Sequence, residues 1–332
     1  MQTYVIDHKT LGSISAATEE LVRCIDTSTD HGRVLCGTSI KAALPWDASP
    51  NWELRHKPPT DALLIHGMPV TQNGEDMTDE VLCLVALMTG MKRGMPWGWA
   101  HQSSIFETIT SAAQYAAAEG IAVDALPIPR VAMASSLSLA PEVVVLAASG
   151  EHDGLRVGWV NSAELTEHMP RELRRGAEEL SFHADGCSSA LPLLYPVVDP
   201  LQPAQLGLGT GGVQADASAS NLAIGAIEYL RAVAAEKMAW INLKPGQVLV
   251  LPNRFGQHAV EFEGRAAVRR VYWNRDLRAH RQHRAETNPL AYVMPSFAAA
   301  GLVAPAPLLA TGQSGEGARL PMAPDIVSHP LH

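Results

Sequence analysis

Short apolar runs separated by turn residues fill the second half of this chain, and they constrain its fold more than any other feature. Runs near 143–148 and 155–161 flank the turn "GEHDG". The stretch "WINLKPGQVLVLPN" (240–253) predicts a strand, a tight turn and a second strand, and a last strand is predicted near 267–273. Many short strands joined by turns are typical of a β-sandwich or jelly roll.

Helical spacing marks several segments around these strands. Apolar periodicity and cap residues predict helices near 77–92, 104–119 and 217–237. A further helix is expected in "SISAATEELVRCIDTST" (13–29), with "DHG" as the breaker behind it, and two short helices in 162–180 are separated by Pro170. Residues 37–60 are expected to be irregular. The predicted class is therefore α+β, a β-sandwich or jelly roll with helices attached.

Composition narrows the functional classes. Of 332 residues, 47% are hydrophobic and 18% charged, which predicts a sizeable core, and the formal charge of −9 argues against a nucleic-acid partner. We find neither a signal peptide nor an apolar run long enough to span a membrane. The four cysteines lack zinc-site spacing, so we expect a reduced, cytoplasmic protein. We expect one domain over 1–303 and a Pro-, Gly- and Ala-rich tail over 304–332.

The sequence argues against three other kinds of site: a dinucleotide-binding loop, a serine hydrolase site and a catalytic thiol. "GLGTGG" (207–212) follows no clear strand and lacks the downstream acid of a dinucleotide-binding fold, so a plain loop is expected. Serine hydrolysis would need a Gly-x-Ser-x-Gly turn, which is absent from the sequence. A thiol nucleophile at Cys187 beside His183 and Asp185 is disfavoured, because sequence neighbours rarely form such a site.

Several motifs, in a consistent order along the chain, resemble one known family. They are "ALLIHGMPV" (62–70), "WGWAHQ" (97–102), "APEVVVLAASGEHDGLRVGWVNSAEL" (140–165), "LKPGQVLVLPNRFGQH" (243–258) and "RVYWNRDLR" (270–278). The chain resembles the clavaminate synthase-like branch of the iron(II)/2-oxoglutarate oxygenases, related to taurine dioxygenase. The resemblance implies a double-stranded β-helix (jelly roll) core flanked by helices. It also implies oxidation of a small amino-acid-like metabolite with Fe(II) and 2-oxoglutarate as cofactors.

The same resemblance assigns metal ligands, but only some of them are present. His258 takes the place of the family's distal histidine. The family's His-x-Asp/Glu pair falls near Val131 and Met133, and residues 131–141 contain neither a histidine nor a carboxylate. Iron(II) in this family needs two histidines and one carboxylate. His183 and Asp185 have the His-x-Asp order and are a candidate replacement, although a non-ligating segment over the barrel mouth is the alternative reading.

An arginine on the strand after the distal histidine binds the far carboxylate of 2-oxoglutarate in this family, through a two-pronged contact. Arg269 and Arg270 are the candidates, and only one of the two can face the interior of a strand. The register of the last motif favours Arg270, while Arg265 is a further possible match.

Two functions remain open from the sequence. The first is a divergent iron(II)/2-oxoglutarate oxygenase whose metal is held by His258, His183 and Asp185. The second is a repurposed scaffold with the same fold and no iron, serving as a binding protein or a non-redox catalyst. The missing pair favours the second, and the preserved histidine and arginine strand favour the first.

Overall fold

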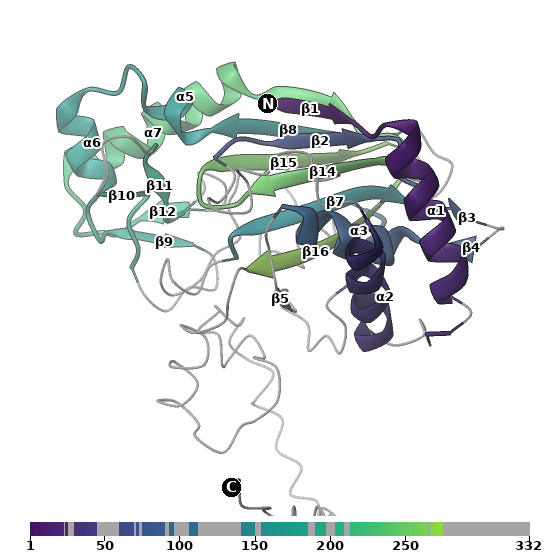
Figure 1. The fold of residues 1–332 in the computed structure, drawn as a ribbon. Helices are drawn as coiled ribbons and strands as arrows, with labels where there is room; N and C mark the ends of the chain where they lie inside the picture. The colour runs from purple at the N-terminus through teal and green to yellow at the C-terminus, as the bar shows by residue number, and fades with distance from the viewer. Residues whose placement is uncertain are drawn as a thin grey trace, which may run out of the picture.

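The computed structural model describes residues 1–22, 24–25, 30–44, 60–69, 71–72, 75–89, 93–95, 106–111, 141–149, 154–184, 190–196, 203–208, 213–263 and 266–274. Helices and β-sheets are combined in this part of the chain, as the predicted α+β class requires (Figure 1). Among the described residues, no helix has the length and apolar character that a membrane span would need. The boundary at residue 303 and the predicted tail lie outside these ranges.

The larger sheet has seven strands in the order β1-β2-β14-β7-β16-β5, with β6 also paired to β16. Its strands are β1 (Gln2–Val5), β2 (Leu63–His66), β14 (Gln247–Pro252), β7 (Val143–Ser149), β16 (Ala267–Asn274), β5 (Arg93–Met95) and β6 (Glu107–Ile109). All neighbours are antiparallel except β1 and β2. The three central strands come from the predicted runs, and they are rich in buried Val and Leu.

A second sheet has three antiparallel strands in the order β13-β8-β15. These strands are β13 (Ala239–Asn242), β8 (Leu155–Asn161) and β15 (Gly256–Phe262). A turn with Gly246 at φ +79° connects β13 to β14, so the chain passes from one sheet to the other within four residues. The remaining strands form two-stranded sheets: β3 (Thr71–Gln72) with β4 (Glu75–Asp76), β9 (Phe182–Ala184) with β12 (Val213–Ala215), and β10 (Leu194–Tyr195) with β11 (Gln205–Leu206).

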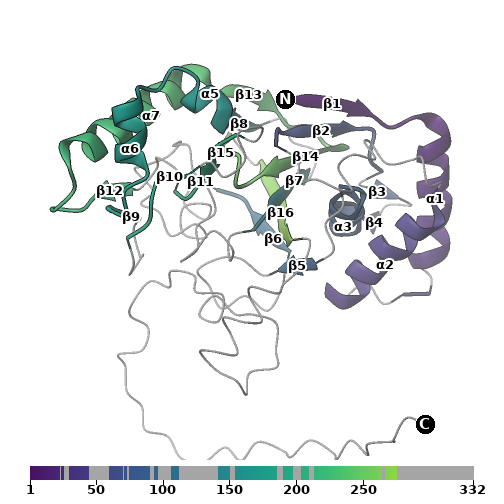
Figure 2. The same ribbon diagram turned by 60° about the vertical axis from the view of Figure 1, so that its left-hand side comes forward.

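Two groups of helices lie on different sides of the sheets (Figures 1 and 2). The first group is α1 (His8–Val22), α2 (Asp30–Ala43) and α3 (Thr78–Met88). It covers the outer face of the larger sheet through one apolar cluster. The second group is α5 (Ser162–Thr166), α6 (Arg171–Ala177) and α7 (Asn221–Lys237), which packs with β9 to β12 in a separate apolar cluster.

A third apolar cluster lies between the two sheets. It takes Val144, Leu146 and Tyr272 from the larger sheet, and Val157 and Val260 from the smaller one, all of them buried. Because side chains alternate between the two faces of a strand, these residues identify which face of each strand points inward. A side chain that points into this cluster therefore lies between the two sheets.

Most predicted elements are confirmed, and three predictions are wrong: the helix near 104–119, the helix breaker "DHG", and the irregular structure expected from residue 37, since residues 37–43 belong to helix α2. The predicted helices near 77–92 and 217–237 are α3 and α7, and Pro170 separates α5 from α6 as expected. Residues 107–109 form a strand rather than part of a helix, because "ETI" pairs with β16 and its β-branched residues suit a sheet edge. Residues 30–43 form helix α2 despite "DHG", because packing against α1 and α3 outweighs a single unfavourable glycine.

Candidate functional site

Arg270 lies on the inward face of the central strand β16. It has the same parity as Val268 and Tyr272, which belong to the cluster between the sheets. Its side chain is completely buried, and its guanidinium carbon lies 5.1 Å from the centre of the Tyr272 ring. A cation over an aromatic face is favourable, and more so where water is excluded. The strand therefore presents a positive charge to the interior between the two sheets.

Arg269 points to the opposite face of the same strand, toward the helices. Its Nε donates a hydrogen bond of 2.8 Å to Oδ1 of Asp79, and its Nη2 pairs with Oδ2 of the same carboxylate. Arg33 on α2 donates a further bond of 2.8 Å from Nη1 to Oδ2. Burial raises the pKa of Asp79, and the contact with Arg269 opposes that rise. Arg269 is thus committed to an ion-pair network under α3.

His258 lies on β15, also with its side chain completely buried. It has the same parity as Val260, so it points into the space between the sheets. Its register partner on β8 is Trp159, whose side chain belongs to the interior cluster. Two sequence candidates, His258 and Arg270, therefore lie on inward faces of opposite sheets. The structure supplies the placement of both residues, and their role as ligands remains a prediction.

Trp159 is part of this interior and contacts the partly exposed Asp61, although neither residue stood out in the sequence. The indole Nε1 of Trp159 donates a hydrogen bond of 3.1 Å to Oδ1 of Asp61, just before β2. A Cβ at Gly256 would lie 2.3 Å from the indole ring, so the ring passes directly over that glycine. The contacts join segments about 100 residues apart. The only sequence signal was a tryptophan within a predicted strand, which core packing explains equally well.

His183 lies on β9, in the part of the structure that packs with α6 and α7. Its Nε2 is 3.0 Å from Oδ2 of Asp216, and both side chains are 37% exposed. Hydrogen bonds from the backbone and side chain of Ser218, together with His183, lower the pKa of Asp216 to about 2. With Nε2 donating to that carboxylate, Nδ1 is the nitrogen left to accept a proton or bind a metal. Asp185, its predicted co-ligand, lies outside the described residues.

Only some of the candidate ligand residues lie within the described part of the chain. Residues 131–133 and Arg265 also lie outside the described ranges. Within those ranges, no group of three or more His, Cys, Asp or Glu side chains is arranged to hold a metal ion. His258 is therefore the one predicted ligand that the described structure places on an inward face of the sheets.

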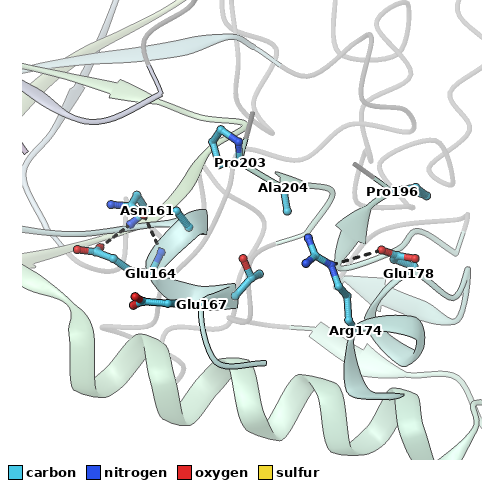
Figure 3. A pocket seen from close by; sticks show the side chains of 10 residues that line it. Asn161, Glu164, Glu167, Arg174, Glu178, Pro196, Pro203 and Ala204 are labelled. Carbon is cyan, nitrogen blue, oxygen red and sulfur yellow. Dashed lines mark hydrogen bonds and ion pairs between the residues drawn. The ribbon is translucent and has the colours of Figure 1, made fainter. Parts of the chain in front are cut away.

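A hollow of about 940 Å³ lies beside α5 and α6 rather than between the sheets (Figure 3). Its walls include Glu164, Glu167, Arg174 and Glu178. Glu164 forms a reciprocal capping box with Asn161 at the start of α5. Nε of Arg174 on α6 lies 3.8 Å from Oε1 of Glu178, the residue at the C-terminal end of that helix. These contacts are typical of local helix stabilisation. Arg270, by contrast, is fully buried between the two sheets, away from this hollow.

Comparison with known proteins adds fold relatives but no sequence relatives. No protein-family model and no curated protein matches the sequence. Among solved structures, asparagine oxygenase bound to Fe(II), 2S,3S-3-hydroxyasparagine and succinate matches with a TM-score of 0.69 at 16% identity, over 89% of this chain and 100% of that one.

A second oxygenase gives a similar match. The non-heme iron oxygenase OrfP, bound to Fe, succinate and (3S)-hydroxy-L-Arg, has a TM-score of 0.64 at 17% identity, over 86% of this chain and 98% of that one. The chain therefore shares its fold with asparagine oxygenase and OrfP, and its resemblance to the clavaminate synthase-like oxygenases is confirmed at the level of the fold.

Proposed function

We propose that this protein is a divergent member of the iron(II)/2-oxoglutarate oxygenases that acts on an amino-acid-like metabolite. The single observation that carries the proposal is the fully buried Arg270 on the inward face of β16, within a fold shared with two oxygenases. Those two proteins were solved with hydroxylated amino acids and succinate. The proposal includes a double-stranded β-helix core formed by the two facing sheets.

Arg270 is the residue proposed to bind the far carboxylate of 2-oxoglutarate. A guanidinium offers two parallel N–H donors to a carboxylate, and such charge-assisted bonds are stronger than neutral ones. In a water-poor interior the attraction is larger than at the surface. Arg269 is not available for this role, because Asp79 already holds its Nε and Nη2. Of the two arginines on β16, the proposal therefore assigns the cofactor contact to Arg270.

Iron(II), when bound, would supply the oxidising chemistry, and His258 with His183 and Asp185 would hold it. The described residues do not by themselves fit a three-ligand iron site, because no group of three or more His, Cys, Asp or Glu side chains among them is arranged to hold a metal ion. We therefore derive no reaction step through the metal.

An iron-free scaffold is the second candidate, and one specific observation favours it. Residues 131–141, where the family's first two ligands are expected, contain no histidine, aspartate or glutamate. A lone imidazole binds iron(II) weakly. In that case the fold and the arginine would serve to bind a carboxylate-bearing metabolite without redox chemistry.

Metal content separates the two candidates. Protein purified without added iron or chelator is assayed for metal, then titrated anaerobically with Fe(II) and 2-oxoglutarate. An oxygenase binds one iron per chain and loses it in His258→Ala and in His183→Ala or Asp185→Ala. A scaffold binds 2-oxoglutarate without iron, and the double variant Val131→His/Met133→Glu then creates iron affinity. Absence of 2-oxoglutarate binding in the wild type would contradict the oxygenase, and absence of binding of both 2-oxoglutarate and succinate would contradict the carboxylate-binding scaffold as well.

A further inference from the structure

The register of the smaller sheet places an aromatic ring next to His258. Trp159 and His258 are directly opposite each other on β8 and β15. Residues opposite each other in an antiparallel pair have Cβ atoms about 5 Å apart on the same face. Trp159 is buried in the cluster between the sheets, so both side chains enter the same interior.

The direction of the indole is set by a glycine. Both Cζ2 and Cη2 of Trp159 lie 2.3 Å from where a Cβ of Gly256 would be. Only a residue without a side chain leaves room for the ring there. The indole therefore lies over the backbone of β15 just before His258, on the side of the β14–β15 turn.

The ring is also tied to the opposite sheet. Its Nε1 donates to Oδ1 of Asp61, which also accepts the N–H of Ala62 at 2.8 Å. Oδ2 of Asp61 is 2.6 Å from the amino nitrogen of Met1. An indole has a single donor, and that donor is used at Asp61. What the ring offers to a ligand is thus an apolar surface held at a fixed angle.

We infer that Trp159 is a specificity-determining wall beside His258, which limits the length of the dicarboxylate that the site accepts. This inference rests on the proposed function, because it takes Arg270 as the anchor of one carboxylate. A rigid wall discriminates by size: the methylenes of a ligand of the right length lie against the indole, and one extra methylene has no room. Pockets of this kind separate homologues that differ by one methylene about tenfold or more.

The test measures the affinities of succinate, 2-oxoglutarate and 2-oxoadipate by calorimetry without added metal. Wild-type protein is expected to bind 2-oxoglutarate more tightly than 2-oxoadipate. Trp159→Ala removes the wall and shifts that ratio about tenfold toward 2-oxoadipate. Gly256→Ala keeps the tryptophan but forces the ring to move, so it changes the ratio as well.

Trp240→Ala is the matched control. Trp240 lies on β13 of the same sheet, pairs with Gly158 and stacks under Arg156 on the outward face. Its removal leaves the ligand ratio unchanged. Trp159→Phe, the variant that best preserves packing, loses the tryptophan fluorescence change that 2-oxoglutarate causes in the wild type. This second readout is independent of whether Trp159→Ala folds.

The outcomes are distinct. An unchanged ratio in Trp159→Ala and Gly256→Ala, with a fluorescence change that persists in Trp159→Phe, overturns the inference and leaves the proposed function standing. A wild type that binds none of the three dicarboxylates without metal overturns the inference, and one that also fails to bind 2-oxoglutarate with Fe(II) present overturns the proposed function as well. A shifted ratio in the two interior variants, absent from Trp240→Ala, supports the wall.

Discussion

The two faces of strand β16 contain the same residue type in adjacent positions, with different surroundings. On the outer face, Arg269 and Arg33 share the carboxylate of Asp79 beneath α2 and α3. On the inner face, Arg270 lies against Tyr272, fully buried between the sheets. The first arrangement joins helix to sheet within the fold itself. The second directs a positive charge to the place where we propose a ligand carboxylate binds.

The outer face contains a second acidic residue in a different situation. Glu80 follows Asp79 on α3 and is almost fully buried, and this burial, with the nearby charge of Asp79, raises its pKa to about 7. Burial, with the charge of Glu80, also raises the pKa of the Cys36 thiol on α2 to about 11. Glu80 is therefore mostly neutral below about pH 7. The pKa of Asp79 is also raised by burial, but the contacts with Arg269 and Arg33 oppose that rise.

The largest expected effect comes from removing the shared carboxylate. Asp79→Ala leaves Arg33 and Arg269 partly buried without it, which we expect to lower the free energy of unfolding by about 3 to 5 kcal/mol. Urea unfolding measures the change. The control is Glu261→Ala, which breaks a more exposed pair with Arg156 and should cost below about 1 kcal/mol. Equal losses in the two variants would show that the network under α3 contributes no more than a surface pair.

The next effect is a pH dependence from Glu80. Its pKa rises from 4.5 in the unfolded chain to about 7 in the folded one, so the folded state binds the proton more tightly. Protonation of Glu80 therefore adds to the free energy of unfolding below pH 4.5. This contribution, at most about 3 kcal/mol, is lost as the pH rises through 7. Glu80→Gln keeps the neutral form at every pH, so it should exceed the wild type in stability at pH 8. Parallel stability curves for the two proteins between pH 4.5 and 8 would contradict this.

The third prediction concerns the inner face. Arg270→Ala should weaken 2-oxoglutarate binding about 10- to 100-fold, because hydrogen bonds to a charged group are lost. Arg270→Lys should recover only part of the affinity, since an ammonium lacks the two-pronged geometry. The control on the same strand is Arg269→Lys, which keeps a charge beside Asp79 and should leave the affinity unchanged. Calorimetry measures the affinity of each variant for 2-oxoglutarate. Similar affinities in all three variants would show that Arg270 does not bind this ligand.

The smallest effect on stability is expected at His183. Its pair with Asp216 is more than one-third exposed, and exposed pairs contribute little. His183→Ala should therefore leave the melting temperature unchanged within error, in contrast to Asp79→Ala. The informative measurement is metal content. Loss of a stoichiometric iron from this variant, with stability intact, would show that His183 is a ligand through Nδ1.

Local patterns in the sequence were sufficient for most elements. The apolar runs of β7, β14 and β16 and the periodicity of α3 and α7 predicted these elements closely, because each pattern reflects its own burial. Strand alternation also predicted that only one of Arg269 and Arg270 faces inward. His258 was identified from its place after "LKPGQVLVLPNRFGQ". Its side chain faces inward, and its role as a metal ligand stays a prediction.

Contacts between distant segments were decided only by the tertiary structure. β13 and β14 flank one tight turn yet belong to different sheets, because turn residues specify a reversal and not the strand that pairs next. Asp79 meets Arg269 across 190 residues, and Trp159 lies over Gly256 with its N–H on Asp61. The sequence by itself determined which segments are buried and with what period. Which arginine holds a structural charge, and which ring lies beside His258, depended on long-range packing, since no local pattern records the neighbours that folding brings together.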